Sequence, residues 1–299
     1  MKIKFFLMSV VMTITCSCTN EDQLKDATGV FEATEVIVSS EANGRILSLD
    51  LTEGELVKEN QVVGLVDSTQ LYFNRLQLES SKVTVETNRP DTQAQIEATE
   101  REIAKQEMEK ERIERLLAGD VATQKQLDDI ESAILILKAR LRSQKSSLSN
   151  SVDAVDAQSN TIDIQIAQLE DQIEKCKISS PIDGTVLVKY VEKGEVTGVG
   201  RALFKVADME NMILRAYVTA DQLLDLKVGQ NLKVFAEFGK EENREYEGKV
   251  SWISEKSEFT PKTIQTQDER ANLVYAVKIA VKNDGYLKIG MYGGFKLAE

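Results

Sequence analysis

The sequence predicts an elongated protein of mixed α and β structure: a β-sandwich split by a long antiparallel α-helical coiled-coil hairpin and followed by a small β-barrel. Three observations predict this fold. A glycine-containing pattern occurs twice, as EANGRILSLDLTEGELV at 41–57 and as SPIDGTVLVKYVEKGEV at 180–196. The stretch between the copies has helical composition. The stretch after the second copy alternates between apolar and polar residues, as half-buried strands do.

The chain begins with a segment typical of an export signal. Two lysines precede an apolar run of about ten residues, far fewer than the roughly 20 that span a bilayer. Cys18 follows a small residue and precedes a polar, acidic stretch, which resembles the cleavage box of bacterial lipoproteins. We expect a signal peptide at 1–17, a lipid on Cys18 with Cys16 as the weaker candidate, and a tether at 18–29. A plain cleaved signal with incidental cysteines is the alternative.

Composition excludes several classes of function. The formal charge is −12 and becomes more negative when a signal peptide with two lysines is removed, so binding to nucleic acid is excluded. The chain has no histidine, which rules out Ser-His-Asp and Cys-His catalysis and histidine-containing zinc sites. Besides the two N-terminal cysteines only Cys176 remains, so no internal disulfide forms. We expect Cys176 to be a small buried residue where the returning helix meets the sandwich.

The repeated pattern predicts two equivalent β units. Gly44 and Gly54 are ten residues apart, as are Gly184 and Gly194, and we expect them to supply the positive φ of tight turns. One such unit cannot bury its apolar face alone. Two facing units would form a sandwich from residues 39–67 and 177–208.

The paired units resemble the biotinyl/lipoyl fold, whose halves are related by a pseudo-twofold axis. In carrier enzymes with this fold, a lysine in the joining turn is modified. Here residues 68–176 replace that turn, and no lysine stands in a carrier-type DKA or MKM context. We therefore expect neither a carrier function nor a cofactor. The acids beside the glycines are expected to be exposed turn residues rather than a catalytic pair.

The insert at 68–176 predicts a helical hairpin. Its second half carries apolar residues at alternating steps of three and four, a heptad seam: Leu127, Ile130, Ile134, Leu137, Leu141, Leu148, Val152, Val155, Ile162, Ile166, Leu169 and Ile173. Its first half carries fewer, namely Ile96, Ile103, Ile113 and Leu117. Gly119 as a helix terminator and Thr123 as an N-cap with Gln126 three residues on place the tip near 118–123. Pro90 should break the outgoing helix, opposite a stutter near Asn150.

Residues 209–299 predict a small antiparallel β-barrel, with 30–38 as its first strand. Two segments alternate with a period of two, placing on one face Leu232, Val234, Ala236 and Phe238 in the first, and Leu273, Tyr275, Val277, Ile279 and Val281 in the second. TADQLLDL predicts a short helix, and the polar stretch 257–272 predicts a loop.

This order of elements resembles the periplasmic adaptor proteins, the membrane fusion proteins of the HlyD type that belong to tripartite efflux and secretion machines. The family pattern at the hairpin tip is Arg, three residues, Leu, six residues, Ser; this chain has Arg112, Leu116 and Thr123 at that spacing. Threonine keeps the hydroxyl but departs from the pattern, which puts docking to the usual channel type in doubt. The C-terminal region is similar to the branch that serves ABC-type exporters.

The resemblance implies a non-enzymatic adaptor in the Gram-negative envelope, lipid-anchored on the periplasmic side of the inner membrane. Its implied partners are an inner-membrane transporter, a TolC-like outer-membrane channel and further copies of itself in a ring of about six, for efflux of drugs or other small molecules. The alternatives are an adaptor for an RND pump or a protein secretion system, a biotin or lipoate carrier domain, and a structural envelope lipoprotein.

Overall fold

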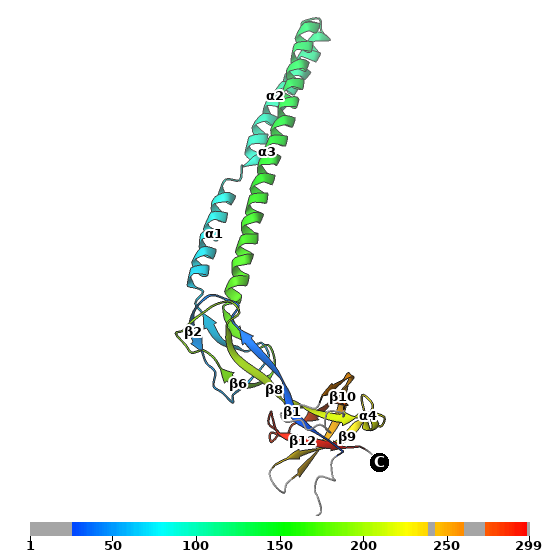
Figure 1. The fold of residues 1–299 in the computed structure, drawn as a ribbon. Helices are drawn as coiled ribbons and strands as arrows, with labels where there is room; N and C mark the ends of the chain where they lie inside the picture. The colour runs from blue at the N-terminus through cyan, green and yellow to red at the C-terminus, as the bar shows by residue number, and fades with distance from the viewer. Residues whose placement is uncertain (1–25, 239–242, 260–272, 298–299) are drawn as a thin grey trace, which may run out of the picture.

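The computed structural model describes residues 26–238, 243–259 and 273–297, and within them the chain forms three parts arranged end to end (Figure 1). A helical hairpin stands on a β-sandwich, and a β-barrel lies on the other side of the sandwich. The predicted fold class is confirmed. Cys16 and Cys18 lie outside the described residues. None of the helices in the described ranges combines the length and the apolar character that a bilayer crossing requires.

The two copies of the repeated pattern interlock in the sandwich. The first copy supplies β2 (Gly44–Leu49), β3 (Leu56–Val57) and β4 (Val62–Val66), and the second supplies β5 (Lys177–Ser179), β6 (Gly184–Lys189) and β7 (Val196–Thr197). Strands from different copies pair antiparallel, β2 with β7, β3 with β6 and β4 with β5. Neither copy is a separate module, because each completes the sheets of the other.

Hydrogen bonds in the sandwich repeat with an offset of 140 residues. The Gly54 amide donates to the carbonyl of Val186 at 2.8 Å, and the Gly194 amide donates to the carbonyl of Ile46 at 2.8 Å. Asparagine and aspartate side chains repeat in the same way. The Glu59 amide donates to Oδ1 of Asp183, and the Val199 amide donates to Oδ1 of Asn43. The sequence repeat is therefore a pseudo-twofold axis in the structure.

The repeat glycines serve two different purposes. Gly54 and Gly194 have φ of 88° and 93° and lie in tight turns, as predicted. Gly184 does not have positive φ, so that part of the prediction is wrong. A Cβ at Gly184 would overlap the carbonyl of Ala207, and one at Gly44 would lie 2.9 Å from Cγ1 of Val66. The first glycine of each copy is thus required where two strands approach closely.

Six strands close into the barrel. They are β1 (Ala27–Ser39), β8 (Ala202–Thr219), β9 (Asn231–Glu237), β10 (Asn243–Phe259), β11 (Leu273–Lys282) and β12 (Tyr292–Lys296). The order β1-β12-β9-β10-β11-β8 returns to β1 through a further β1–β8 pairing. Helix α4 (Ala220–Leu223) follows β8, in the segment predicted to be helical.

Two long strands run through both β parts, which corrects the predicted boundaries. In β1, Thr28–Glu32 pairs with the barrel half of β8 and Thr34–Ser39 pairs with its sandwich half. The segment 30–38 is therefore only partly a barrel strand, and ordered strand already begins at Ala27, within the expected tether. The register shift between Glu32 and Thr34 marks the passage from one part to the other. The alternation of apolar and polar residues in β1 and β8 does not reveal where the sandwich ends and the barrel begins, because each strand is half-buried in both parts.

The barrel core corrects one further detail. Leu232, Val234 and Ala236 of β9 are buried as predicted. In β11, Val277, Ile279 and Val281 belong to the core, whereas Leu273 is 51% exposed and Val274 is buried instead. The cause is a bulge in the neighbouring strand β10. Val277 pairs with Ile253 and Tyr275 pairs with Ser257, so β10 advances four residues where β11 advances two. Such a bulge turns the strand and shifts the alternation. Strand β10 also extends to Phe259, so residues 257–259 are not loop, and residues 260–272 lie outside the description.

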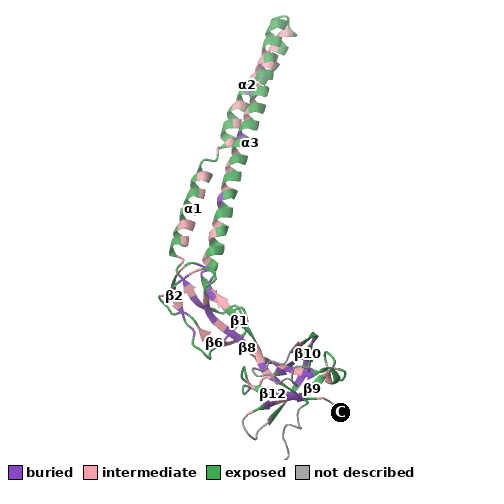
Figure 2. Cartoon of the chain, viewed as in Figure 1, coloured by how far each residue is buried: buried purple, intermediate pink, exposed green. Residues whose placement is uncertain are grey.

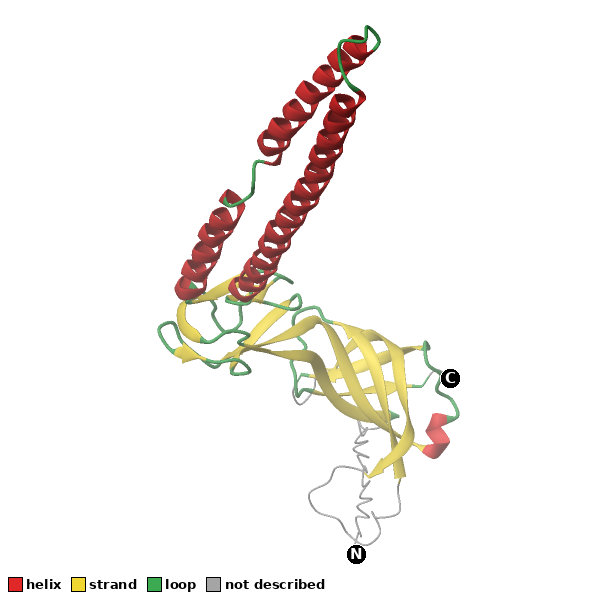
Figure 3. Cartoon of the chain, turned by 90° about the horizontal axis from the view of Figure 1, so that it is seen from above, coloured by secondary structure: helices red, strands yellow, loops and turns green. Residues whose placement is uncertain are grey.

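The hairpin consists of three helices, α1 (Thr69–Thr87), α2 (Thr92–Leu117) and α3 (Gln124–Glu174) (Figure 3). The outgoing arm is interrupted at residues 88–91, which include Pro90. The returning helix has 51 residues without interruption, which at ~1.5 Å per residue is about 77 Å. All residues of the predicted seam are buried or half-buried, and Figure 2 shows the remaining helix surface to be largely exposed.

The two halves of the outgoing arm pack differently against α3. Helix α2 buries Ile103, which faces the half of α3 that buries Ile134 and Leu148. Helix α1 has no buried residue and is joined to α3 by ion pairs such as Lys82–Asp163 at 2.6 Å. The break faces a lower part of α3 than predicted, because Arg89 next to Pro90 binds Asp156 at 3.0 Å rather than a residue near Asn150.

Candidate functional site

The candidate site is the tip of the hairpin, the point farthest from the barrel (Figure 1). Residues 118–123 join α2 to α3. The carbonyl of Leu116 accepts hydrogen bonds from the amides of Gly119 and Val121, at 3.2 and 2.9 Å. The residue in the left-handed conformation is Asp120, with φ of 61°, rather than Gly119. The prediction that Gly119 ends the helix is therefore wrong in detail, because aspartate tolerates this conformation.

Thr123 begins the returning helix and is held by its own turn. Oε1 of Gln126 accepts hydrogen bonds from the Thr123 amide at 2.9 Å and from its hydroxyl at 3.2 Å. With the Thr123 side chain also facing the backbone of Gln126, the predicted capping box is present. The hydroxyl is exposed, and its contacts are with its own turn, so a partner would have to share its oxygen with the capping box.

Arg112 and Leu116 lie one helical turn apart on α2, on the surface of the hairpin rather than in its seam. The Arg112 side chain is 64% exposed and pairs with Glu109 at 2.6 Å. Leu116 is 38% exposed, whereas the neighbouring Leu117 faces α3. Leu116 therefore lies outside the seam. The structure brings both residues to the same end as Thr123, but each makes its polar contacts with its own neighbours.

Val121 is a tip residue that the sequence analysis missed. It is 75% exposed, next to the half-exposed Leu116. The sequence could have indicated this exposure, because an apolar residue in the turn between Asp120 and Thr123 lies outside both helices and cannot pack in the seam. The Val121 amide is hydrogen-bonded to the Leu116 carbonyl, so the two exposed apolar residues lie close together at the end of the hairpin that also carries Arg112 and Thr123. Such a surface can pack into a groove between partner helices, and the exposed Arg112 guanidinium has further N–H donors, beyond the one that binds Glu109, for a partner carboxylate or backbone carbonyl.

The remaining expected residues have structural surroundings. Cys176 is fully buried, as predicted, and its Sγ lies 3.3 Å from the carbonyl oxygen of Gln172. Burial and the nearby charge of Asp67 raise the pKa of its thiol, which disfavours the reactive thiolate. Within the described ranges no group of three or more Cys, Asp and Glu residues is placed to hold a metal ion.

Comparison with known proteins identifies the sandwich and its insert. The family model for the CzcB-like, barrel-sandwich hybrid domain matches residues 34–208. A UPF0194 membrane protein of Yersinia enterocolitica is 26% identical, with 90% of this chain and 89% of that protein aligned. A UPF0194 membrane protein of Citrobacter koseri is also 26% identical, over 88% of this chain and 85% of that protein.

Solved structures share the fold. MacA from Actinobacillus actinomycetemcomitans matches with a TM-score of 0.56 and 21% identity, over 91% of this chain and 78% of that one. A MacA-MexA chimera that contains the Pseudomonas aeruginosa MexA α-hairpin domain matches with a TM-score of 0.51 and 21% identity, over 91% and 81% of the two chains. Since the family model covers more than half of the sequence, the chain belongs to the family of proteins that carry a CzcB-like barrel-sandwich hybrid domain.

Proposed function

We propose that this protein is a non-enzymatic periplasmic adaptor that links an inner-membrane transporter, of the ABC type in preference to the RND type, to a TolC-like outer-membrane channel. Its cargo would be drugs or other small molecules. The observation that carries the proposal is an exposed apolar tip, formed by Leu116 and Val121, at the end of a helical arm about 77 Å long. An arm of this length is not needed to build a binding pocket in the β domains, but it can carry the tip toward a partner in the opposite membrane.

The position of the N-terminus supports the proposed direction of the arm. The first described strand begins at Ala27, and this end of β1 lies in the barrel. Ala27 is nine positions after Cys18, a distance of at most about 30 Å when extended. A lipid on Cys18 would therefore hold the barrel near the inner membrane, while the tip points away from it.

The docking part of the proposal is tested by Leu116→Asp. A carboxylate in place of the apolar side chain should abolish export and the capture of the channel, because burying an unpaired charge in a helix groove is strongly unfavourable. Leu135→Asp is a matched control, since Leu135 is 68% exposed on the same hairpin away from the tip. Both variants should keep the helix content of the wild type in circular dichroism.

A photo-crosslinker at position 116 separates the alternatives. Capture of an outer-membrane channel supports the adaptor, whereas normal export by Leu116→Asp with no crosslink to a channel would reject tip docking and leave a structural envelope lipoprotein. Copurification with the detergent-extracted full chain identifies an ABC or an RND partner. Mass spectrometry that shows a biotin- or lipoate-modified lysine would instead point to a carrier domain.

A further inference from the structure

The pseudo-twofold axis of the sandwich relates two strand pairs at its surface that differ in the charge of the surrounding residues. One, here called the acidic flank, surrounds the β3–β6 pair, where Leu56 lies opposite Thr185. The other, here called the basic flank, surrounds the β2–β7 pair, where Arg45 lies opposite Val196. Each position of the acidic flank has its counterpart 140 residues away on the basic flank, so the two surfaces can be compared residue by residue.

Both flanks present an apolar residue to solvent at the same position. Leu56 is 78% exposed and its counterpart Val196 is 64% exposed, with Val199 at 68% beside it. The following residues, Val57 and Thr197, are buried. The strands thus place one side chain in the sandwich and the other outside it, and the exposed one does not contribute to the core.

The charges of the flanks have diverged. The acidic flank carries four acids and one lysine, a formal charge of −3: Glu53, Glu55, Lys58, Glu59 and Asp183, with Gln61 and Thr185 neutral. At the same positions of the basic flank, with Glu192 opposite the neutral Thr52 included, stand three cations and two acids, a formal charge of +1: Lys193, Arg201, Arg45, Glu192 and Glu195, with Gly198, Val199 and Asn43 neutral. The fold does not require this difference in charge, because the backbone contacts of the two flanks are the same.

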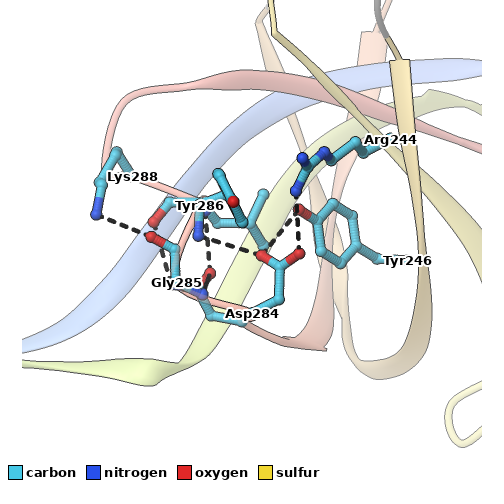
Figure 4. A network of polar contacts seen from close by, with 8 residues as sticks. Arg244, Tyr246, Asp284, Gly285, Tyr286 and Lys288 are labelled. Atoms are coloured by element: carbon cyan, nitrogen blue, oxygen red, sulfur yellow. Dashed lines mark hydrogen bonds and ion pairs between the residues drawn. The ribbon is translucent and has the colours of Figure 1, made fainter.

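A groove of about 460 Å³ lies beside Leu56, between the sandwich and the barrel. Its walls include Leu187, Met209 and Lys288. The barrel wall is a loop fixed by a polar network (Figure 4): Oδ1 of Asp284 accepts from the Tyr246 hydroxyl at 3.1 Å, and Arg244 stacks 3.9 Å above the ring centre of Tyr286. The groove is therefore preformed, and it is apolar at its base.

We propose that a second copy of this chain docks its basic flank onto the acidic flank, with Val196 and Val199 packing against Leu56 and the groove beside it. Two acidic flanks repel each other, and so do two basic flanks, which leaves the mixed contact as the complementary one. Because the two surfaces are different, the contact is heterologous and repeats from copy to copy, as in a ring. The inference names the contact within the ring that the proposed function requires.

Cysteine crosslinking tests the pairing directly. Leu56→Cys and Val196→Cys are made as separate variants of the full chain, each with its own tag, and are coexpressed and oxidised. A disulfide between the two variants, with neither variant crosslinking to itself, is the expected result. Self-crosslinking of Leu56→Cys, or no mixed disulfide, overturns the proposal. The wild type, whose Cys176 is buried, and Leu224→Cys, 82% exposed on the barrel, are the controls.

Charge exchange tests the cause. Glu59→Lys and Lys193→Glu should each weaken self-association of the detergent-extracted chain about fivefold at low salt, in line with about 1 kcal/mol for an exposed charge pair, and the double variant should recover most of it. Equal association of all four proteins in sedimentation velocity would overturn the electrostatic argument. Leu116→Asp, added to the Leu56→Cys and Val196→Cys variants, should leave their mixed disulfide intact. Failure of the contact between copies can thus be told apart from failure of tip docking.

Discussion

Replacing Gly184 with alanine tests the close approach of β6 to β8 within the sandwich. An alanine Cβ would overlap the Ala207 carbonyl oxygen and lie 2.8 Å from its carbonyl carbon and 3.0 Å from Cγ2 of Val206. The atoms in the way are mostly backbone of β8, the strand that continues into the barrel. They can give way only if β6 and β8 separate.

The expected cost is at the upper end of the about 1–3 kcal/mol that overpacking causes. For a β region of this size, a loss of that order lowers the melting temperature by about 4–10 °C. Gly44→Ala would meet the side chain of Val66 first rather than backbone, a softer clash, but it adds backbone strain because Gly44 has φ of 157°. Gly54→Ala meets nothing within 4 Å but has φ of 88°, so only conformational strain, about 1 kcal/mol, is expected.

Differential scanning calorimetry of the three variants gives the order of stability, with Gly119→Ala as control. At Gly119 the nearest atom to a new Cβ is 3.7 Å away and φ is not left-handed, so the melting temperature should stay within about 2 °C of the wild type. If Gly184→Ala melts at the wild-type temperature, the close-approach argument is refuted.

Three further predictions concern the hairpin, the thiol and the barrel loop. In hydrogen–deuterium exchange, α1 at 69–87 should exchange faster than α2 at 92–117, because α1 has no buried residue; equal protection would contradict this. Cys176 should resist alkylation in the native protein at about pH 8 and react in denaturant, because burial raises the pKa of its thiol. Burial alone would raise the pKa of Asp284, but the hydrogen bonds from the Tyr286 amide and the Tyr246 hydroxyl together outweigh it, so the pKa is lowered. The stabilisation by Asp284 is then present above its usual pKa and is lost as pH falls through the lower folded value, so the melting-temperature gap to Asp284→Asn should close below about pH 4; a constant gap would speak against it.

Much of the architecture could be read from periodicity. The heptad seam from Leu127 to Ile173 and the β alternation from Leu232 to Ala236 depend on local spacing, and the structure shows these residues buried or half-buried. The errors fall where a distant neighbour decides. Leu273 is exposed because β10 bulges opposite β11, and Gly184 is needed because of Ala207. Neither partner lies within the window that a periodic pattern covers.

The candidate site was predictable in position but not in detail. Arg112, Leu116 and Thr123 were placed at a turn by helix signals and by resemblance, yet their spacing could not show that Leu116 leaves the seam or that Val121 stands beside it. Whether a residue at the end of a hairpin faces its partner helix depends on the local crossing of the two helices, which small changes in register alter.

The element types, the repeat, the absence of histidine and the net acidity follow from residue identity and short-range spacing. Long-range packing sets how the repeats interlock, carries β1 and β8 through both β parts, and places the two equivalent strand pairs of different charge on separate surfaces. The physical reason is that strand pairing joins residues about 140 positions apart, and such contacts are selected by the packing of the whole sandwich rather than by any local preference.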